Sequence, residues 1–265
     1  MRVIHRIGVL GGSPKVKAAF LAAGFNIARI ESLKIPEDDA RWPAIQKLIR
    51  AFRLVDIPMT EFLDTELKAA KYLHMVGTWH NGYPEPSDDF TYKEITFDPS
   101  AGCRQCGVGL KQIAPFRLKR APKWGRRSAF QLYWVFDEVF VRPEVWDATF
   151  APLGIGCSPV VLDRTGEVIQ NVVQLNIKEV SDVDVEKLEF ETCSECGSKK
   201  FSPKLPGFQP APLSPIGPIF KSDQYFGSGG QAFRLVMLAN DAYRKISARG
   251  FHGFEFLACS SGNAV

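Results

Sequence analysis

The feature that most constrains this chain is a five-residue loop, C-x-x-C-G, that occurs twice, as CRQCG at 103–107 and as CSECG at 193–197. Each loop offers two thiolates from one tight turn. The Gly after the second Cys permits a positive φ, which lets backbone amides turn back toward sulphur. Four thiolates complete the shell of a tetrahedral ion. We therefore predict a structural Zn²⁺ site held by Cys103, Cys106, Cys193 and Cys196.

The spacing of the two loops is unusual for a zinc site. Zinc ribbons commonly leave about 15–20 residues between the two cysteine pairs, whereas residues 107–192 lie between Cys106 and Cys193 here. A long insertion is permitted, because the entropy of closure grows only with the logarithm of loop length. Two alternatives remain open. The loops could bind no metal, or one of them could perform thiol–disulfide chemistry, which favours a C-x-x-C at the start of a helix.

A closed Cys₄ shell leaves no open position for water or substrate, so we expect the zinc to be structural and not catalytic. Cys157 and Cys259 have no C-x-x-C partner and are expected to be small buried apolar residues.

Composition indicates an ordinary globular protein. The chain has 265 residues, of which 45% are hydrophobic and 23% charged, enough for one large domain or two small ones. A net charge of +4 does not by itself require a nucleic-acid partner. No apolar run approaches the roughly 18–20 residues of a membrane span, and the start, MRVIHRIGVLGG, lacks a secretory pattern. We expect a cytoplasmic protein, where reduced cysteines favour metal binding.

Apolar spacing predicts helices in the first hundred residues and strands after residue 128. Helical periodicity is found at 14–25, 41–55 and 60–75. Later segments alternate or are rich in β-branched and aromatic residues, which predicts strands at 128–141, 158–163, 167–180, 187–193, 233–239 and 251–259. Asn240 is expected to cap a helix that ends at Gly250. The proline-rich stretch 203–218 is expected to be irregular.

These patterns predict an α+β fold. A mainly helical region would occupy 1–100, and a β-rich double-CXXCG domain would occupy 101–265. The second domain would hold a mostly antiparallel sheet and a split, zinc-ribbon-like Cys₄ site.

No catalytic constellation stands out, so we predict that the chain is not an enzyme. The four His residues are scattered at 5, 74, 80 and 252. Asp137 and Glu138 are adjacent, and on a regular strand they would point to opposite faces. The loop GTWHNGYPEPSDDFTY at 77–92 is either a packed connection or the rim of a ligand site.

Two charged runs flank the cysteine loops. The run 111–127 is basic and holds no acidic residue, whereas 179–195 is rich in Asp and Glu and holds one Lys. If a metal joins the two loops, the basic run and the acidic run lie close together where they adjoin the loops. Their charges could then neutralise one another, or a partner protein of complementary charge could bind them. Basic and aromatic residues interleaved in this way also suit nucleic acid. The candidate partner-binding residues are Arg117, Lys119, Arg120, Lys123, Trp124, Arg126 and Arg127.

Over about residues 101–259 the layout resembles the bacterial double-CXXCG motif proteins, several of which are described as immunity proteins against secreted toxins. The resemblance rests on GCRQCG, TCSECG and the tail FRLVMLANDAYRKISARGFHGFEFLAC. It implies that the four cysteines are zinc ligands and that the chain ends in strand, short helix and strand. The first hundred residues lie outside it.

Three functions follow as expectations. The first is a non-enzymatic, zinc-stabilised bacterial protein that binds a partner protein, such as a toxin that it neutralises. The second is a nucleic-acid-associated zinc-ribbon protein that uses the basic run 111–127. The third is an enzyme with a cleft built on the loop 77–92.

Overall fold

The computed structural model describes residues 1–9, 13–27, 30–215 and 217–260. Strands hold 33% of the residues and helices 21%, in several sheets. The predicted fold class, a helical N-terminal segment followed by a sheet domain, is therefore wrong. Two compact units make up the chain, one of Met1–Glu66 and Lys204–Phe208, the other of Leu67–Pro203 and Gln209–Val265.

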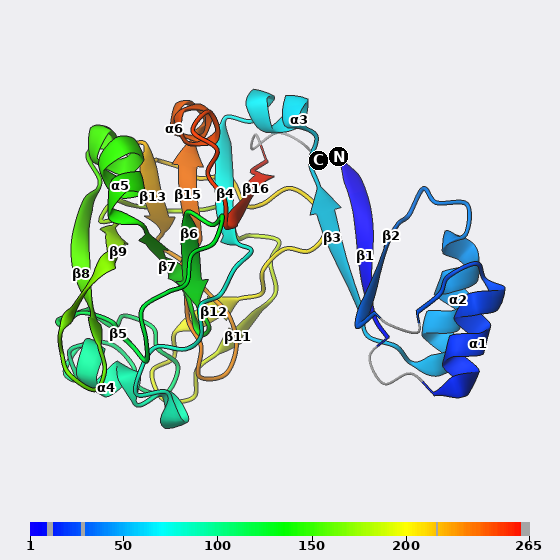
Figure 1. Ribbon diagram of the computed structural model, residues 1–265, viewed down its shortest axis with the longest axis horizontal. Helices are drawn as coiled ribbons and strands as arrows, with labels where there is room; N and C mark the ends of the chain where they lie inside the picture. Colours follow the sequence, from blue (N-terminus) through cyan, green and yellow to red (C-terminus); the bar gives the residue numbers. More distant parts are fainter. Residues whose placement is uncertain (10–12, 28–29, 216, 261–265) are drawn as a thin grey trace. The chain divides into compact units, whose positions relative to one another are not determined.

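The first unit is a three-stranded antiparallel sheet with two helices. The sheet has the order β2-β1-β3, from β1 (Arg2–Gly8), β2 (Ser32–Pro36) and β3 (Asp56–Glu61). Helices α1 (Pro14–Ala22) and α2 (Trp42–Phe52) match two predicted helices. They lie side by side on one face of the sheet (Figure 1). Their apolar side chains and those of the strands form a core of their own.

The second unit contains a five-stranded sheet of order β10-β13-β15-β4-β16. Its strands are β4 (Tyr72–Gly77), β10 (Val180–Ser181), β13 (Ile219–Ser222), β15 (Val236–Ala239) and β16 (Phe254–Ala258). The helix predicted at 60–75 is wrong over most of its length. Only α3 (Asp64–Ala69) is helical, and the chain then enters β4, which lies between β15 and β16 (Figure 1).

A second five-stranded sheet has the order β5-β8-β9-β7-β6. Its strands are β5 (Arg117–Leu118), β6 (Ala129–Leu132), β7 (Val135–Val141), β8 (Gly156–Leu162) and β9 (Val168–Asn176). The strands predicted at 158–163 and 167–180 are confirmed by β8 and β9. The segment 128–141, predicted as one strand, instead forms the antiparallel hairpin of β6 and β7. Between β7 and β8 the chain forms the short helical turns α5 (Pro143–Val145), Trp146–Phe150 and Ala151–Leu153. Apolar residues of both five-stranded sheets share one buried cluster.

A small sheet of order β11-β12-β14 carries the second cysteine loop. Its strands are β11 (Phe190–Thr192), β12 (Lys199–Phe201) and β14 (Tyr225–Phe226). The first loop lies in the connection from α4 (Tyr92–Thr96), which follows the single turn Asp88–Phe90, to β5. The two loops thus come from different parts of the fold.

The predicted strand–helix–strand ending is confirmed by β15, α6 (Asn240–Ser247) and β16. The capping role predicted for Asn240 is wrong, because Asn240 is the first residue of the helix. Its side chain instead donates hydrogen bonds to the carbonyls of Leu67 and Ala70. No helix within the described ranges is both long and apolar enough to cross a bilayer.

Candidate metal centre

The two cysteine loops share one backbone pattern. In the first, the amide of Cys103 donates to the carbonyl of Val108, and the amide of Gly107 donates to the carbonyl of Cys103. In the second, Cys193 donates to the carbonyl of Ser198 and Gly197 donates to that of Cys193. Both loop glycines have the positive φ expected from the sequence, +84° and +70°. Each loop is therefore a tight turn that presents two sulphurs to one side.

The loops bring all four predicted ligands together. The four sulphurs lie within 4.8 Å of one another. Two contacts link the loops directly, Cys103 Sγ to Cys193 Sγ at 3.9 Å and Cys106 Sγ to Cys196 Sγ at 3.7 Å. A tetrahedral zinc with Zn–S bonds of about 2.3 Å separates its sulphurs by about 3.8 Å. The cluster could therefore hold a metal ion without a large rearrangement.

The cysteines differ in their surroundings. Cys106 and Cys193 are buried, and Cys196 is exposed. Burial raises the pKa of Cys106 to about 12, whereas hydrogen bonds from the side chain and backbone of Ser198 lower the pKa of Cys196 to about 6. A thiol ligand must lose its proton to bind metal. Without metal, Cys196 is therefore favoured as a thiolate. Cys106 requires a bound cation to lose its proton.

Two buried lysines flank the cluster, and sequence reasoning missed both. Lys200 is 1% exposed and pairs with Glu191 at 2.7 Å. Lys93 is 9% exposed, and burial lowers its pKa, an effect that the nearby sulphurs of Cys106 and Cys103 partly oppose. Its ammonium donates to the carbonyl of Gly230 at 2.6 Å. A zinc ion with four thiolates carries two negative charges. Lys200 is already neutralised by Glu191, so Lys93 is the buried ammonium that offsets part of the charge of a metal-bound cluster.

The loop of the first pair is closed at its base. Phe97 and Gln112 form an isolated β-bridge, and the amide of Asp98 donates to the carbonyl of Lys111 at 2.9 Å. Within the loop the backbone crosses itself closely, because a Cβ on Gly102 would lie 2.4 Å from backbone atoms of Gly109 and Leu110. Closure and crossing fix the direction in which the first two sulphurs point.

Neither loop stands at the start of a helix, which is the context that redox C-x-x-C motifs use. The first lies in a long connection and the second is the turn between β11 and β12. The remaining cysteines lie outside the cluster. Cys259 is buried, and burial strongly raises its pKa; Cys157 is half-buried on β8.

The candidate partner-binding residues divide into two groups. Trp124 is only 8% exposed, packs in the core and donates its indole N–H to the carbonyl of Asn171 at 2.9 Å. It is therefore not available for stacking on a partner. Arg117 is half-buried. The other five are exposed, and we refer to them as the basic surface: Lys119, Arg120, Lys123, Arg126 and Arg127.

The acidic run does not neutralise this basic surface within the chain. The acidic side chains of the run are exposed, and among the described residues no ion pair joins 111–127 to 179–195. Within the basic surface, the guanidinium of Arg127 lies 4.6 Å from the ring centre of Trp79. Both charged runs therefore face outward.

The histidines do not approach the sulphurs. His5 lies between Asp56 and Glu37, with a carboxylate oxygen 2.9 Å from each ring nitrogen. Burial lowers the pKa of His74 to about 4. His80 stacks on Tyr133, and His252 is exposed.

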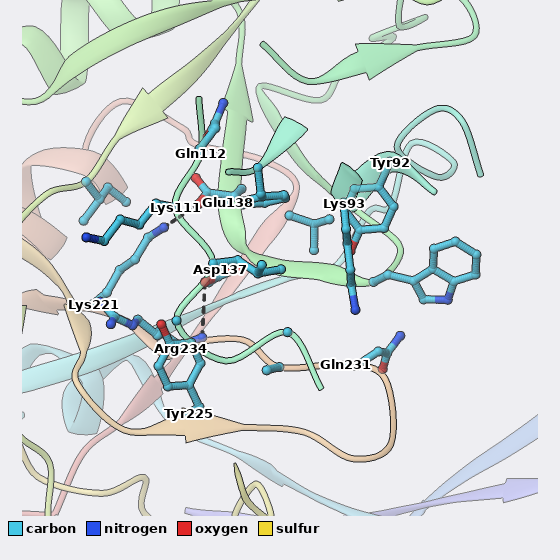
Figure 2. A pocket seen from close by; sticks show the side chains of 18 of the residues that line it. Tyr92, Lys93, Lys111, Gln112, Asp137, Glu138, Lys221, Tyr225, Gln231 and Arg234 are labelled. Atoms are coloured by element: carbon cyan, nitrogen blue, oxygen red, sulfur yellow. Dashed lines mark hydrogen bonds and ion pairs between the residues drawn. The ribbon is translucent and has the colours of Figure 1, made fainter. Parts of the chain in front are cut away.

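The two adjacent carboxylates on β7, Asp137 and Glu138, line one cavity (Figure 2). Asp137 accepts a hydrogen bond from the backbone amide of Arg234, whereas Glu138 pairs with Lys221 at 2.6 Å. That their side chains point to opposite faces of the strand stays a prediction.

The loop 77–92 packs against the core at three of its aromatic residues, and one further aromatic residue lines a surface hollow. Trp79 and Phe90 pack against the core, and Tyr92 is buried within it. Tyr83 is 43% exposed and lines a hollow with Lys119, Arg120 and Arg164.

Comparison with known proteins does not identify a family for this chain. No family model matches the chain, and no curated protein matches it. The resemblance to double-CXXCG proteins therefore stays a prediction that rests on the quoted motifs.

Proposed function

We propose that this chain is a non-enzymatic bacterial protein that binds a partner protein, in the manner of an immunity protein toward a toxin, and that a structural zinc holds its binding unit together. The zinc ligands are Cys103, Cys106, Cys193 and Cys196. The metal is assigned a structural role because all four tetrahedral positions would be filled by sulphur.

One observation carries the partner-binding part of the proposal. The basic surface has no carboxylate partner within the described chain, although a long acidic run follows in the same unit. Exposed charge that is not matched internally speeds association with an oppositely charged partner and selects against wrong ones. An acidic protein surface is thus the complement that we propose.

A matched pair of charge reversals tests this proposal. Lys119→Glu/Lys123→Glu alters the basic surface, and Lys15→Glu/Lys17→Glu changes the net charge equally on exposed positions of α1. Each protein is used to capture partners from the native host, and the captured protein is identified, purified and titrated. We expect the first variant alone to lose a saturable partner, and the partner to be toxic unless the unaltered chain is co-expressed. Equal capture by both variants would contradict the proposal.

The nucleic-acid alternative is favoured by the same exposed Lys and Arg side chains, but not by Trp124, which is buried. It predicts binding to arbitrary duplex DNA or RNA whose affinity falls steeply with salt. A fluorescence-anisotropy titration with a random duplex at low and high salt separates the two. Tight, salt-dependent binding that Lys119→Glu/Lys123→Glu abolishes would replace the protein partner by nucleic acid.

A further inference from the structure

The second unit contains a cavity of about 420 Å³ beside the first cysteine loop. Its walls come from α4, the loop residues Gly107 and Gly109, β7, β13 and the segment 225–234 (Figure 2). This volume lies in the range of sites for small organic molecules. None of the functions considered above uses it.

A buried ion pair forms part of the wall. Lys221, which is 8% exposed, donates to Glu138 at 2.6 Å, and Gln174 donates to the same carboxylate at 2.8 Å. Gln112 in turn exchanges hydrogen bonds with Gln174. Removing two charges from water is unfavourable unless the site is well ordered. The pair neutralises itself, so it leaves the net charge of the cavity to other residues.

The remaining charges give the cavity an excess of positive charge. Lys111 and Lys178 are exposed at its edge and form no ion pair within the described chain. The guanidinium of Arg234 meets the exposed Asp223 only at 3.9 Å, and its buried Nε has no hydrogen-bond partner among the described residues. One further carboxylate, Asp137, opposes these three cations, and it accepts a hydrogen bond from the backbone of Arg234. The lysine near the sulphurs, Lys93, is left to the metal cluster.

Aromatic side chains provide the apolar part of the lining. Tyr92, Phe97, Trp134 and Tyr225 all contribute. Trp134 has a φ of +69°, a conformation that a bulky residue rarely adopts. Such strained residues gather at ligand sites, where the surrounding structure holds them in place. Here the strained residue places an indole in the wall of a cationic cavity.

From this combination we propose that the cavity binds a small organic dianion, an anion with two negative charges on a compact apolar body. Lys111, Lys178 and Arg234 would contact the charged groups, and the aromatic residues would contact the body. A phosphate monoester and a dicarboxylate share this chemistry.

Isothermal titration calorimetry on the metal-loaded full chain tests the proposal with three aromatic probes. Phenyl phosphate and isophthalate are aromatic dianions, and phenol is the uncharged control. We expect saturable one-to-one binding of at least one dianion and none of phenol. The dianion that binds more tightly identifies the charged group as phosphate or carboxylate.

Two matched variants locate the site. Lys111→Gln/Lys178→Gln removes exposed charge from the edge of the cavity, and Lys15→Gln/Lys17→Gln removes the same charge from exposed positions of α1. A hydrogen bond to a charged group contributes roughly 1.5–3 kcal/mol, and 1.4 kcal/mol corresponds to tenfold. We therefore expect the first variant to weaken dianion binding at least about tenfold and the second to leave it unchanged. The proposal is overturned if neither dianion saturates, if phenol binds equally well, or if both variants behave alike.

Discussion

At the scale of single residues, the second unit holds buried charges whose partners lie far away in sequence. Lys93 is the clearest case. Burial lowers its pKa, the sulphurs of Cys106 and Cys103 partly oppose that shift, and its ammonium has no ion-pair partner among the described residues. A buried ammonium near the sulphurs of Cys106 and Cys103 favours their thiolate forms. Its role is electrostatic and does not require contact with the metal.

Replacing Lys93 by Met should weaken metal binding roughly 10–100-fold, the effect typical of lost outer-shell partners. Competition against a chromophoric chelator measures this change. Lys123→Met, which removes an exposed lysine from the basic surface, is the control and should bind metal as the unaltered chain does. Equal metal affinity in both variants would show that Lys93 does not compensate the cluster.

The Glu138–Lys221 pair leads to a pH-dependent prediction. Burial raises the pKa of Glu138 above its usual value. A carboxyl group whose folded-state pKa is raised favours folding when protonated, and this stability is lost as the pH rises through the folded pKa. Lys221→Met removes the opposing cation, so it should destabilise the fold by about 3–5 kcal/mol where Glu138 is ionised.

We therefore expect the melting temperature of Lys221→Met, relative to the unaltered chain, to fall further at pH 8 than at pH 5. Differential scanning fluorimetry across this range measures the difference. The double variant Glu138→Gln/Lys221→Met should lose most of the pH dependence. A constant difference between pH 5 and 8 would count against a buried ionised pair.

At the scale of elements, the two cysteine loops have the same turn but different surroundings. Gly102 precedes the first loop where two backbone segments touch, whereas Gly197 ends the second loop with no atom near its missing Cβ. Gly102→Ala should therefore displace the loop and abolish metal retention. Gly197→Ala should cost only the strain of a positive φ, about 1–2 kcal/mol.

Metal content after dialysis against a weak chelator, together with thermal melting, compares these two variants. Retention in Gly197→Ala and loss in Gly102→Ala is the expected order. The reverse order would mean that the crossing of the backbone at Gly102 does not position the first two sulphurs.

The elements also show what sequence could and could not predict. The C-x-x-C-G turns were predictable because a glycine with positive φ is a local requirement. The hairpin of β8 and β9 was predictable because alternation and a DRTGE turn lie within one short stretch. In contrast, β4 was misread as helix because Leu67, Ala70 and Leu73 continue a helical spacing across its start.

Non-local pairing accounts for the remaining errors. Leu73 and Met75 are buried at alternate positions, as in a strand. This segment forms a strand only because β15 and β16, which come from the end of the chain, pair with β4 on its two sides. β1 was missed because one of its buried positions is His5, which only the distant Glu37 and Asp56 make acceptable. In the candidate site, Lys93 and Lys200 escaped notice for the same reason, since lysine is seldom buried and its partners here are remote.

At the scale of the whole molecule, the cysteine cluster belongs to one compact unit. Residues 103–106 and 193–196 both lie in the second unit, and the first unit has a separate core. Metal removal should therefore destabilise the second unit around the two cysteine loops and leave the first unit unchanged. Hydrogen exchange measured by mass spectrometry should show faster exchange around 98–111 and 190–201 after chelation, while β1 to β3 keep their protection.

The quadruple Cys→Ser variant serves as the comparison for that experiment and should reproduce the pattern of the chelated protein. Uniform loss of protection in both units would contradict a local structural role. Unchanged exchange around the two loops would show that the metal does not stabilise this unit.

The 90-residue separation between Cys103 and Cys193 also has a consequence for synthesis. At about 5–20 residues per second, the ribosome needs roughly 5–18 s to add the second pair after the first has been made. During that interval the thiols of Cys103 and Cys106 lack the second cysteine pair. They cannot complete a four-thiolate site, and the β11–β12 hairpin does not yet cover them. If the four cysteines hold a metal, as we propose, we therefore expect a transient oxidant to harm newly made chains more than finished ones.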